Sequence, residues 1–305
     1  MGKVALLFSG QGAQCPGMGK DLYENNAASR EVFDRLATRR GDIKELCFSS
    51  TKEELTVTSN TQPALFAVEL AAAAALTAAG VKVDTVAGFS LGEISALAYS
   101  HVMPLEEAFD LVMERGRLMQ EASASVHSAM TAVLKLSNEQ VETIAAHHNQ
   151  VYPVNYNCPG QVVVSGLAES LPAFEAEVKE AGGRCMRLAV AGAFHSPFME
   201  GAAARFKEEL GRHSFAKPTV PLYSNVTGEL YGEDMLPLLS RQMSSPVRWE
   251  TTVRNMLSSG IDVFIESGPG STLSGLVKKT CPEAKTLSIA TCEALEETLK
   301  ALQEN

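Results

Sequence analysis

The segment TVAGFSLGEISAL, residues 85–97, decides the fold. An apolar run ends in the pattern Gly-x-Ser-x-Gly, and the residues that follow have the pattern of a helix. This combination predicts a nucleophile elbow, a sharp turn between strand and helix that lifts the Ser90 hydroxyl above a sheet. A Cβ atom at Gly88 or Gly92 would crowd the backbone where strand and helix approach each other. On the pattern alone, the alternative is a structural turn with an unreactive serine.

Strands alternate with helices on both sides of this segment, which predicts an α/β fold with a mainly parallel sheet. Residues 3–9 form an apolar strand, as expected for a strand buried on both faces. The strand ends in the sequence GQGAQ at 10–14, a loop suited to close approach of the backbone. Further helices are expected at 29–39, 61–79, 105–121, 196–212, 233–242 and 249–258 and from residues 271 and 292, with strands at 219–223 and 262–266.

The middle of the chain has a different pattern. The order of its elements is β-α-β-β-α-β, which is typical of a ferredoxin-like unit. We therefore predict a ferredoxin-like subdomain at 127–191, inserted into an α/β-hydrolase-like subdomain formed by 1–126 and 192–305. Its strands are expected at 130–136, 151–156, 161–165 and 184–190, with a helix opened by the capping box SNEQ at 137–140 and a second helix at 171–181.

Composition excludes some classes of protein. A chain of 305 residues with a net charge of −10 has no basic footprint for nucleic acid. The six cysteines show no C-x-x-C spacing, so we interpret them as reduced thiols of a cytosolic protein. The apolar run at 64–80 contains Glu69 and Thr77 and predicts a buried helix, not a membrane span. The run at 4–8 is too short for a signal peptide. These features predict a cytoplasmic protein that binds neither nucleic acid nor a membrane.

A serine nucleophile needs a base, and His195 is the best of the six histidines. The sequence AGAFHSP at 191–197 predicts the end of a strand and the start of a helix, where the inserted subdomain returns to the main body. His195 also follows Ser90 in chain order, as in α/β-hydrolase-like sites. A structural histidine is the alternative. No acidic residue between the two stands out as the third member of a triad, although a backbone carbonyl could orient the imidazole.

Seven motifs occur in order along essentially the whole chain. They are FSGQGAQ at 8–14, TQPA at 61–64, GFSLGE at 88–93, RGRLMQ at 115–120, NYNCPGQ at 155–161, GAFHS at 192–196 and ESGPG at 266–270. With these motifs the chain resembles the malonyl-CoA:acyl-carrier-protein transacylases of bacterial fatty-acid synthesis. It resembles the acyltransferase domains of polyketide synthases more loosely.

The resemblance implies a catalytic role for several residues. Ser90 would take the malonyl group as an ester, and His195 would act as its base. The backbone carbonyl of Gln242 would orient the imidazole. The amides of Gln11 and Leu91 would form the oxyanion hole, where two fixed donors can each supply a few kcal/mol.

The resemblance also implies a substrate pocket. Arg115 would hold the malonyl carboxylate, because a guanidinium forms two parallel hydrogen bonds to a carboxylate. Phe194 would crowd a 2-methyl branch and so disfavour methylmalonyl groups. Gln62, Asn155 and Asn157 resemble pocket-lining positions, with structural amides as the alternative interpretation.

Two positions depart from the common pattern of the family. Phe89 stands before the nucleophile where histidine is usual, which puts in doubt a polar contact near the mouth of the site. Ser128 stands where glycine is usual, at the entry to a strand.

The resemblance implies malonyl-CoA and an acyl carrier protein as partners, with no metal or bound cofactor. The sequence itself does not give the oligomeric state, and a monomer is the default expectation. Three alternatives remain. A discrete acyltransferase of a polyketide synthase would use the same chemistry. A hydrolase that clears acyl groups from carrier proteins is less compatible with Arg115, because it would favour uncharged chains. A non-catalytic docking protein is disfavoured by the set of Ser90, His195 and Arg115.

Overall fold

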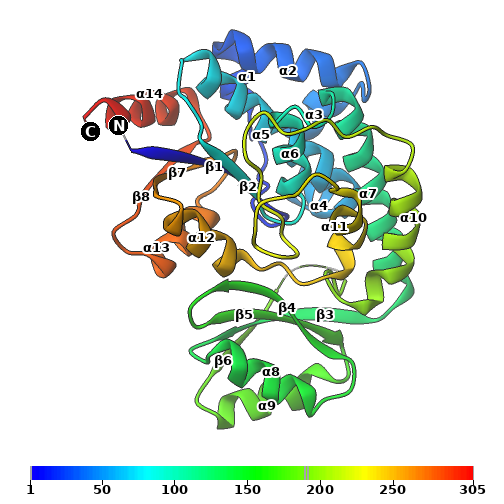
Figure 1. The fold of residues 1–305 in the computed structure, drawn as a ribbon. Coiled ribbons are helices and arrows are strands. Elements are labelled where there is room, and N and C mark those ends of the chain that lie inside the picture. The colour runs from blue at the N-terminus through cyan, green and yellow to red at the C-terminus, as the bar shows by residue number, and fades with distance from the viewer. Residues whose placement is uncertain (1, 189, 191, 305) are drawn as a thin grey trace.

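The computed structural model describes residues 2–188, 190 and 192–304 (Figure 1). Its parallel sheet has the strand order β2-β1-β7-β8. In this sheet β1 (Lys3–Phe8) lies between β2 (Thr85–Gly88) and β7 (Ile261–Ser267), and β8 (Lys285–Ile289) forms one edge. The α/β fold with a mainly parallel sheet is therefore confirmed.

Helices cover both faces of the parallel sheet. Val4, Leu6 and Phe8 of β1 face one layer, whereas Ala5 and Leu7 face the other, as the alternation of side chains along a strand requires. The helices around the sheet are α1 (Lys20–Asn25), α2 (Ala27–Ala37), α3 (Ile43–Phe48), α4 (Lys52–Thr56), α5 (Thr58–Ala78), α6 (Gly92–Tyr99), α7 (Leu105–Ser125), α10 (Glu200–Leu210), α11 (Leu236–Arg241), α12 (Trp249–Ser258), α13 (Thr272–Thr280) and α14 (Cys292–Gln303).

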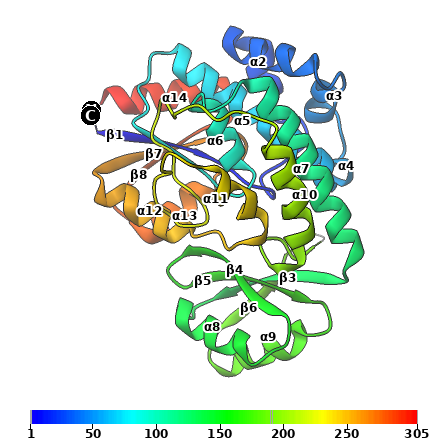
Figure 2. The ribbon, with the colours of Figure 1, turned by 45° about the vertical axis from the view of Figure 1, so that its right-hand side comes forward.

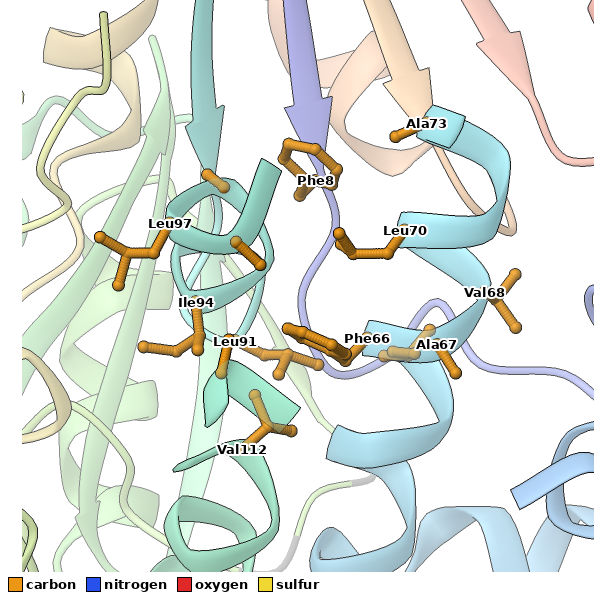
Figure 3. Close-up of a cluster of buried hydrophobic side chains, with 14 of the residues drawn as sticks. Phe8, Phe66, Ala67, Val68, Leu70, Ala73, Leu91, Ile94, Leu97 and Val112 are labelled. Carbon is orange, nitrogen blue, oxygen red and sulfur yellow. The ribbon is translucent and has the colours of Figure 1, made fainter. Parts of the chain in front are cut away.

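The central helix α5 packs between the sheet and α7. It is long and apolar enough to cross a membrane, but most of it is buried inside the fold, as predicted for the run at 64–80. Figure 3 shows Phe66 and Leu70 of α5 among side chains of β1 and α6. This core fixes the ends of β1 and β2, from which the candidate site is built.

The inserted subdomain has the predicted order β-α-β-β-α-β and forms a separate layer (Figure 2). Its antiparallel sheet has the strand order β4-β5-β3-β6. One face of the sheet packs on its own two helices, and the other faces the large subdomain. The elements are β3 (Ser128–Leu134), α8 (Asn138–Ala146), β4 (Val151–Cys158), β5 (Gln161–Leu167), α9 (Leu171–Glu180) and β6 (Arg184–Arg187).

The boundaries of the two subdomains stay a prediction. Position 191, at the predicted C-terminal boundary of the insertion, lies outside the described residues. Position 189, inside the strand predicted at 184–190, does too.

Two expectations about elements need correction. The strand predicted at 219–223 does not form a ladder: residue Leu222 makes an isolated bridge to Val86 of β2. Pro221 offers no N–H group there, so the pairing cannot extend. The helix predicted from residue 196 begins instead as a 3-10 turn (Pro197–Met199) and becomes α-helical only in α10. Strand β8 and the short helices α1, α3 and α4 were not predicted.

The contribution of the core around α5 to stability can be tested by substitution. Phe66 is fully buried, with its ring centroid 5.7 Å from that of Phe109. We expect Phe66→Ala to lower the free energy of unfolding by about 3–5 kcal/mol, because it removes a large buried ring and leaves a cavity. Urea denaturation measures this change. Val57→Ala, at an exposed position, is the control and should change the free energy little; equal effects of the two substitutions would contradict the assignment of the core.

Candidate active site

The turn between β2 and α6 has the geometry of a nucleophile elbow. Ser90 has a φ of 55°, in the left-handed region that non-glycine residues rarely adopt. A Cβ atom at Gly88 would lie 1.8 Å from the carbonyl carbon of Gly92. A Cβ atom at Gly92 would lie 2.2 Å from the carbonyl oxygen of Phe8. Glycine is thus required at both positions, as the sequence predicted, and the turn holds Ser90 at the end of the parallel sheet.

The structure brings His195 to Ser90 across a long separation in sequence. The distance from Nε2 of His195 to Oγ of Ser90 is 2.7 Å. On the other side of the ring, Nδ1 lies 3.1 Å from the carbonyl oxygens of both Gln242 and Ser245. Since a carbonyl can only accept, Nδ1 carries the proton and Nε2 is free to accept one from the serine. The carbonyl of Ser245 is a partner that the sequence did not indicate.

His195 is nearly completely buried. Its burial, together with the nearby charge of Arg115, lowers the pKa of the imidazole from its usual 6.5 to about 4. The ring is therefore neutral near neutral pH, which is the state that a general base requires.

Arg115 of α7 points its guanidinium at the same serine. Its Nη2 lies 3.1 Å from Oγ of Ser90 and donates to Oε1 of Gln242 at 2.8 Å. Its Nη1 donates to Oε1 of Gln62 at 2.9 Å, and its Nε has no partner among the described residues. The side chain is fully buried, and this burial lowers the pKa of Arg115 to about 10. A buried cation with an unused donor beside a hydroxyl is suited to binding an anion.

The side chain of Gln242 links this guanidinium to a buried carboxylate. Its Nε2 donates to the carbonyl oxygen of Ser90 and to Oε2 of Glu93, both at 2.7 Å. Oε1 of Glu93 accepts from the amide of Asn225 at 3.0 Å and from the hydroxyl of Tyr231 at 2.6 Å. Glu93 thus accepts three hydrogen bonds. Burial raises the pKa of its carboxyl group, whereas these donors and the charge of Arg115 oppose the rise, and Glu93 in turn favours the charged form of the buried guanidinium. The sequence indicated only the backbone of Gln242.

Asn225, which lies outside the Gly-x-Ser-x-Gly motif, forms hydrogen bonds to the backbone on both sides of the elbow. Its Oδ1 accepts from the amide of Ser90 at 2.6 Å, and its Nδ2 donates to the carbonyl of Gly88. Neither Asn225 nor Tyr231 was predicted. The sequence offered one indication of Asn225: the polar pair SN at 224–225 follows directly after an apolar segment predicted as a strand, where side chains can reach the edge of the sheet.

The backbone amides of Gln11 and Leu91 are the candidate oxyanion donors. The loop with Gln11 lies against the elbow, since a Cβ atom at Gly10 would be 2.8 Å from the carbonyl oxygen of Phe89. Gln11 lies in the loop after β1, and Leu91 is the N-cap residue of α6. Among the described residues, no hydrogen bond from either amide is found. The positive end of the α6 dipole adds to the field at this position.

A cleft beside the elbow separates the two subdomains. The large subdomain contributes Gln11 and Phe89, and the small one contributes Asn155, Asn157 and Met186. Both asparagines are more than nine-tenths buried, and their Oδ1 atoms have no partner in the described part of the chain. The two residues line the cleft, while these Oδ1 atoms are themselves buried.

Two aromatic side chains lie close to the site. Phe89 packs against Trp249, with ring centroids 5.5 Å apart and ring planes tilted by 60°, and lines the cleft. Phe194 is buried directly before His195, and its carbonyl accepts from the hydroxyl of Ser165.

The model of the acyl transferase domain matches residues 5–299 of the chain. The chain belongs to the acyl transferase family. Its relatives include the malonyl CoA-acyl carrier protein transacylase of Bacillus subtilis (strain 168), which is 38% identical over 312 residues that cover 100% of this chain and 98% of the relative.

Solved structures resemble this acyltransferase over its whole length. The malonyl CoA-acyl carrier protein transacylase from Clostridium perfringens superimposes with a TM-score of 0.96 and 40% identity, covering 99% of this chain and 98% of the other. A malonyl-transacylase in complex with a type II polyketide synthase acyl-carrier protein gives a TM-score of 0.93 at 33% identity, covering 99% of this chain and 100% of the other.

The geometry of this acyltransferase predicts how the reactivity of Ser90 depends on pH. Protonation of His195 removes the base, so the rate of labelling by a fluorophosphonate should fall about tenfold per pH unit below pH 4. The rate should be constant between pH 5.5 and 7. Mass spectrometry of the labelled protein measures the rate, and circular dichroism checks that the fold persists. His195→Ala should remove the pH dependence together with most of the labelling; a midpoint near 6.5 would contradict the buried environment of the imidazole.

Proposed function

We propose that this acyltransferase moves the malonyl group of malonyl-CoA to the phosphopantetheine thiol of an acyl carrier protein, in fatty-acid synthesis. The reaction is ping-pong and passes through a malonyl ester of Ser90. The observation that carries the proposal is the buried guanidinium of Arg115, 3.1 Å from the nucleophilic hydroxyl. The names of the relatives support the same donor and acceptor.

In the first half-reaction, Nε2 of His195 takes the proton of Ser90 while Oγ attacks the thioester carbonyl carbon. The amides of Gln11 and Leu91 donate to the oxyanion of the tetrahedral intermediate. Collapse breaks the bond between carbon and sulfur. The imidazolium then gives its proton to the departing CoA sulfur, and the ester remains on Ser90.

In the second half-reaction, the phosphopantetheine thiol gives its proton to His195 and attacks the ester carbonyl. The bond between carbon and Oγ of Ser90 breaks, and the proton returns to the serine. A thioester is converted to an ester and back, so this chemistry requires neither a redox group nor a metal. Carbonyl oxygens orient the imidazole in place of a carboxylate, which keeps a second negative charge away from the malonyl group.

Arg115 would select the acyl group through its charge. In the malonyl ester, the free carboxylate takes the place beside the guanidinium that the hydroxyl of Ser90 occupies in the unacylated enzyme. Gln62 and Gln242 hold the guanidinium from the other side and keep it in position. An acetyl group would leave this buried charge without an anionic partner. Phe194 would restrict the space at the 2-position.

The cleft would hold the pantetheine arm. Its amide N–H groups are donors, and Asn155 and Asn157, whose Oδ1 atoms have no partner in the described part of the chain, would supply acceptors by turning these side chains toward the cleft. We propose that the inserted subdomain at 127–191 provides this wall and excludes water from the ester.

The first test is the intact mass of the purified protein after incubation with malonyl-CoA. We expect a gain of one malonyl group, which is lost again when an acyl carrier protein with its phosphopantetheine is added. Ser90→Ala should show no gain. An ester that decays to free malonate at the same rate with and without carrier protein would indicate a hydrolase and contradict the proposal.

A second test concerns selectivity. Arg115→Ala removes a charge-assisted pair worth about 3 kcal/mol, so kcat/KM for malonyl-CoA should fall about 100-fold. Activity with acetyl-CoA should fall less, and the ratio of the two should shift toward acetyl. Arg117→Ala is the matched control on the same helix, because Arg117 is exposed and bonds to Glu114. An unchanged ratio in Arg115→Ala would contradict the assigned role.

A further inference from the structure

A buried carboxyl group behind the active site takes no part in the proposed transfer. Glu69 lies in the middle of α5 and is fully buried. Its Oε1 accepts from the hydroxyl of Ser9 at 2.7 Å, and its Oε2 accepts from the hydroxyl of Ser95 at 2.6 Å. Both serines are buried as well. One carboxyl group therefore joins the end of β1 to helix α6.

These two serines adjoin the two halves of the proposed oxyanion hole. Ser9 directly precedes the loop that contains Gln11. Ser95 lies in the first turn of α6, which begins directly after Leu91. We propose that Glu69 is a positioning residue that sets the distance between the amides of Gln11 and Leu91. This inference rests on the proposed function.

The surroundings of Glu69 make the connection rigid. The hydroxyl of Ser267, at the end of β7, donates to the carbonyl oxygen of Glu69 at 2.8 Å. Gly268, with a φ of 100°, lies so close that a Cβ atom there would be 2.9 Å from Cγ of Glu69. The carboxyl group of Glu69 is thus held by Ser9, directly after β1, and by Ser95 of α6, while Ser267 of β7 holds its backbone.

Titration provides a readout that a purely structural residue would lack. Burial raises the pKa of Glu69 to about 8, although the two serine hydroxyls oppose this shift. Glu266 on β7 is the charged group that faces it in the described part of the chain; its carboxylate accepts from the amides of Leu273 and Ser274. Ser9, directly after β1, contributes its hydroxyl and its backbone amide, and α6 contributes the hydroxyl of Ser95.

The protonation state changes the charge beside the hole and keeps both hydrogen bonds. As a neutral acid, Glu69 donates to one serine and accepts from the other, because a hydroxyl can do either. As a carboxylate it accepts from both. The negative charge then acts in a region of low dielectric and opposes a developing oxyanion. Acylation of Ser90 should therefore slow as the pH rises through 8.

The experiment measures the rate at which malonyl-CoA acylates Ser90 between pH 6.5 and 9.5, by mass spectrometry. This half-reaction involves no carrier thiol. In the wild type we expect a fall with a midpoint near pH 8. Glu69→Gln is a permanent mimic of the neutral acid and should stay within threefold of the wild type at pH 7, with no fall near pH 8. Glu69→Leu should acylate at least tenfold more slowly, with KM for malonyl-CoA unchanged.

Ser29→Ala is the matched control. The hydroxyl of Ser29 in α2 is buried and donates to the carbonyl oxygen of Ala71 at 2.9 Å. Ala71 lies on α5, the helix that carries Glu69, but Ser29 is not part of the oxyanion loop. This variant should acylate within twofold of the wild type, whereas Ser9→Ala and Ser95→Ala should each be several-fold slower.

Two results would overturn the inference. One is a pH profile without the expected dependence on Glu69: either the acylation rate of the wild type stays constant through pH 8, or the acylation rate of Glu69→Gln still falls near pH 8. The other is a folded Glu69→Leu variant that acylates as fast as Ser29→Ala. If Glu69→Leu does not fold, the pH profile of Glu69→Gln decides alone. Failure of the wild type to acquire any malonyl group would reject the proposed function, a result distinct from both.

Discussion

The site depends on a single cation that has been removed from water. The guanidinium of Arg115 is fully buried, and a buried charge is tolerated only where polar groups surround it. Gln62 and Gln242 supply acceptors, and Glu93 supplies the opposite charge behind Gln242. Burial lowers the pKa of His195, and the same cation lowers it further, which keeps the base neutral. The proposed affinity for an anionic acyl group and the readiness of the nucleophile thus share one of their physical causes.

The sequence predicted the parts of the site that are local. Gly88 and Gly92 report a steric constraint between neighbouring elements, so their spacing is enough to indicate the elbow. The chain order of Ser90 and His195 indicated a base, and the resemblance to a family supplied Arg115. The order of elements in the inserted subdomain was also readable, because helix and strand periods alternate there.

What the sequence could not indicate is pairing between distant segments. The contacts of Asn225 with the amide of Ser90, and of Tyr231 with Glu93, join residues that no local pattern relates. The segment at 219–223 has the composition of a strand, but Pro221 prevents a ladder. Helix α5 was read correctly as core from its apolar run, yet Glu69 within it was used only as an argument against a membrane span.

The two faces of the β4-β5-β3-β6 sheet pack against different parts of the protein. One face, with Val133, Val162 and Val164, is closed by α8 and α9 into a core of its own. The opposite face supplies Ala132 and Asn155 to the cleft. The second face also carries a packing constraint, because Met130, Ala132, Val154 and Val163 belong to the core of the large subdomain. A substitution that reshapes the cleft from this face therefore also changes how the two subdomains are joined, so the width of the cleft and the stability of the junction are coupled.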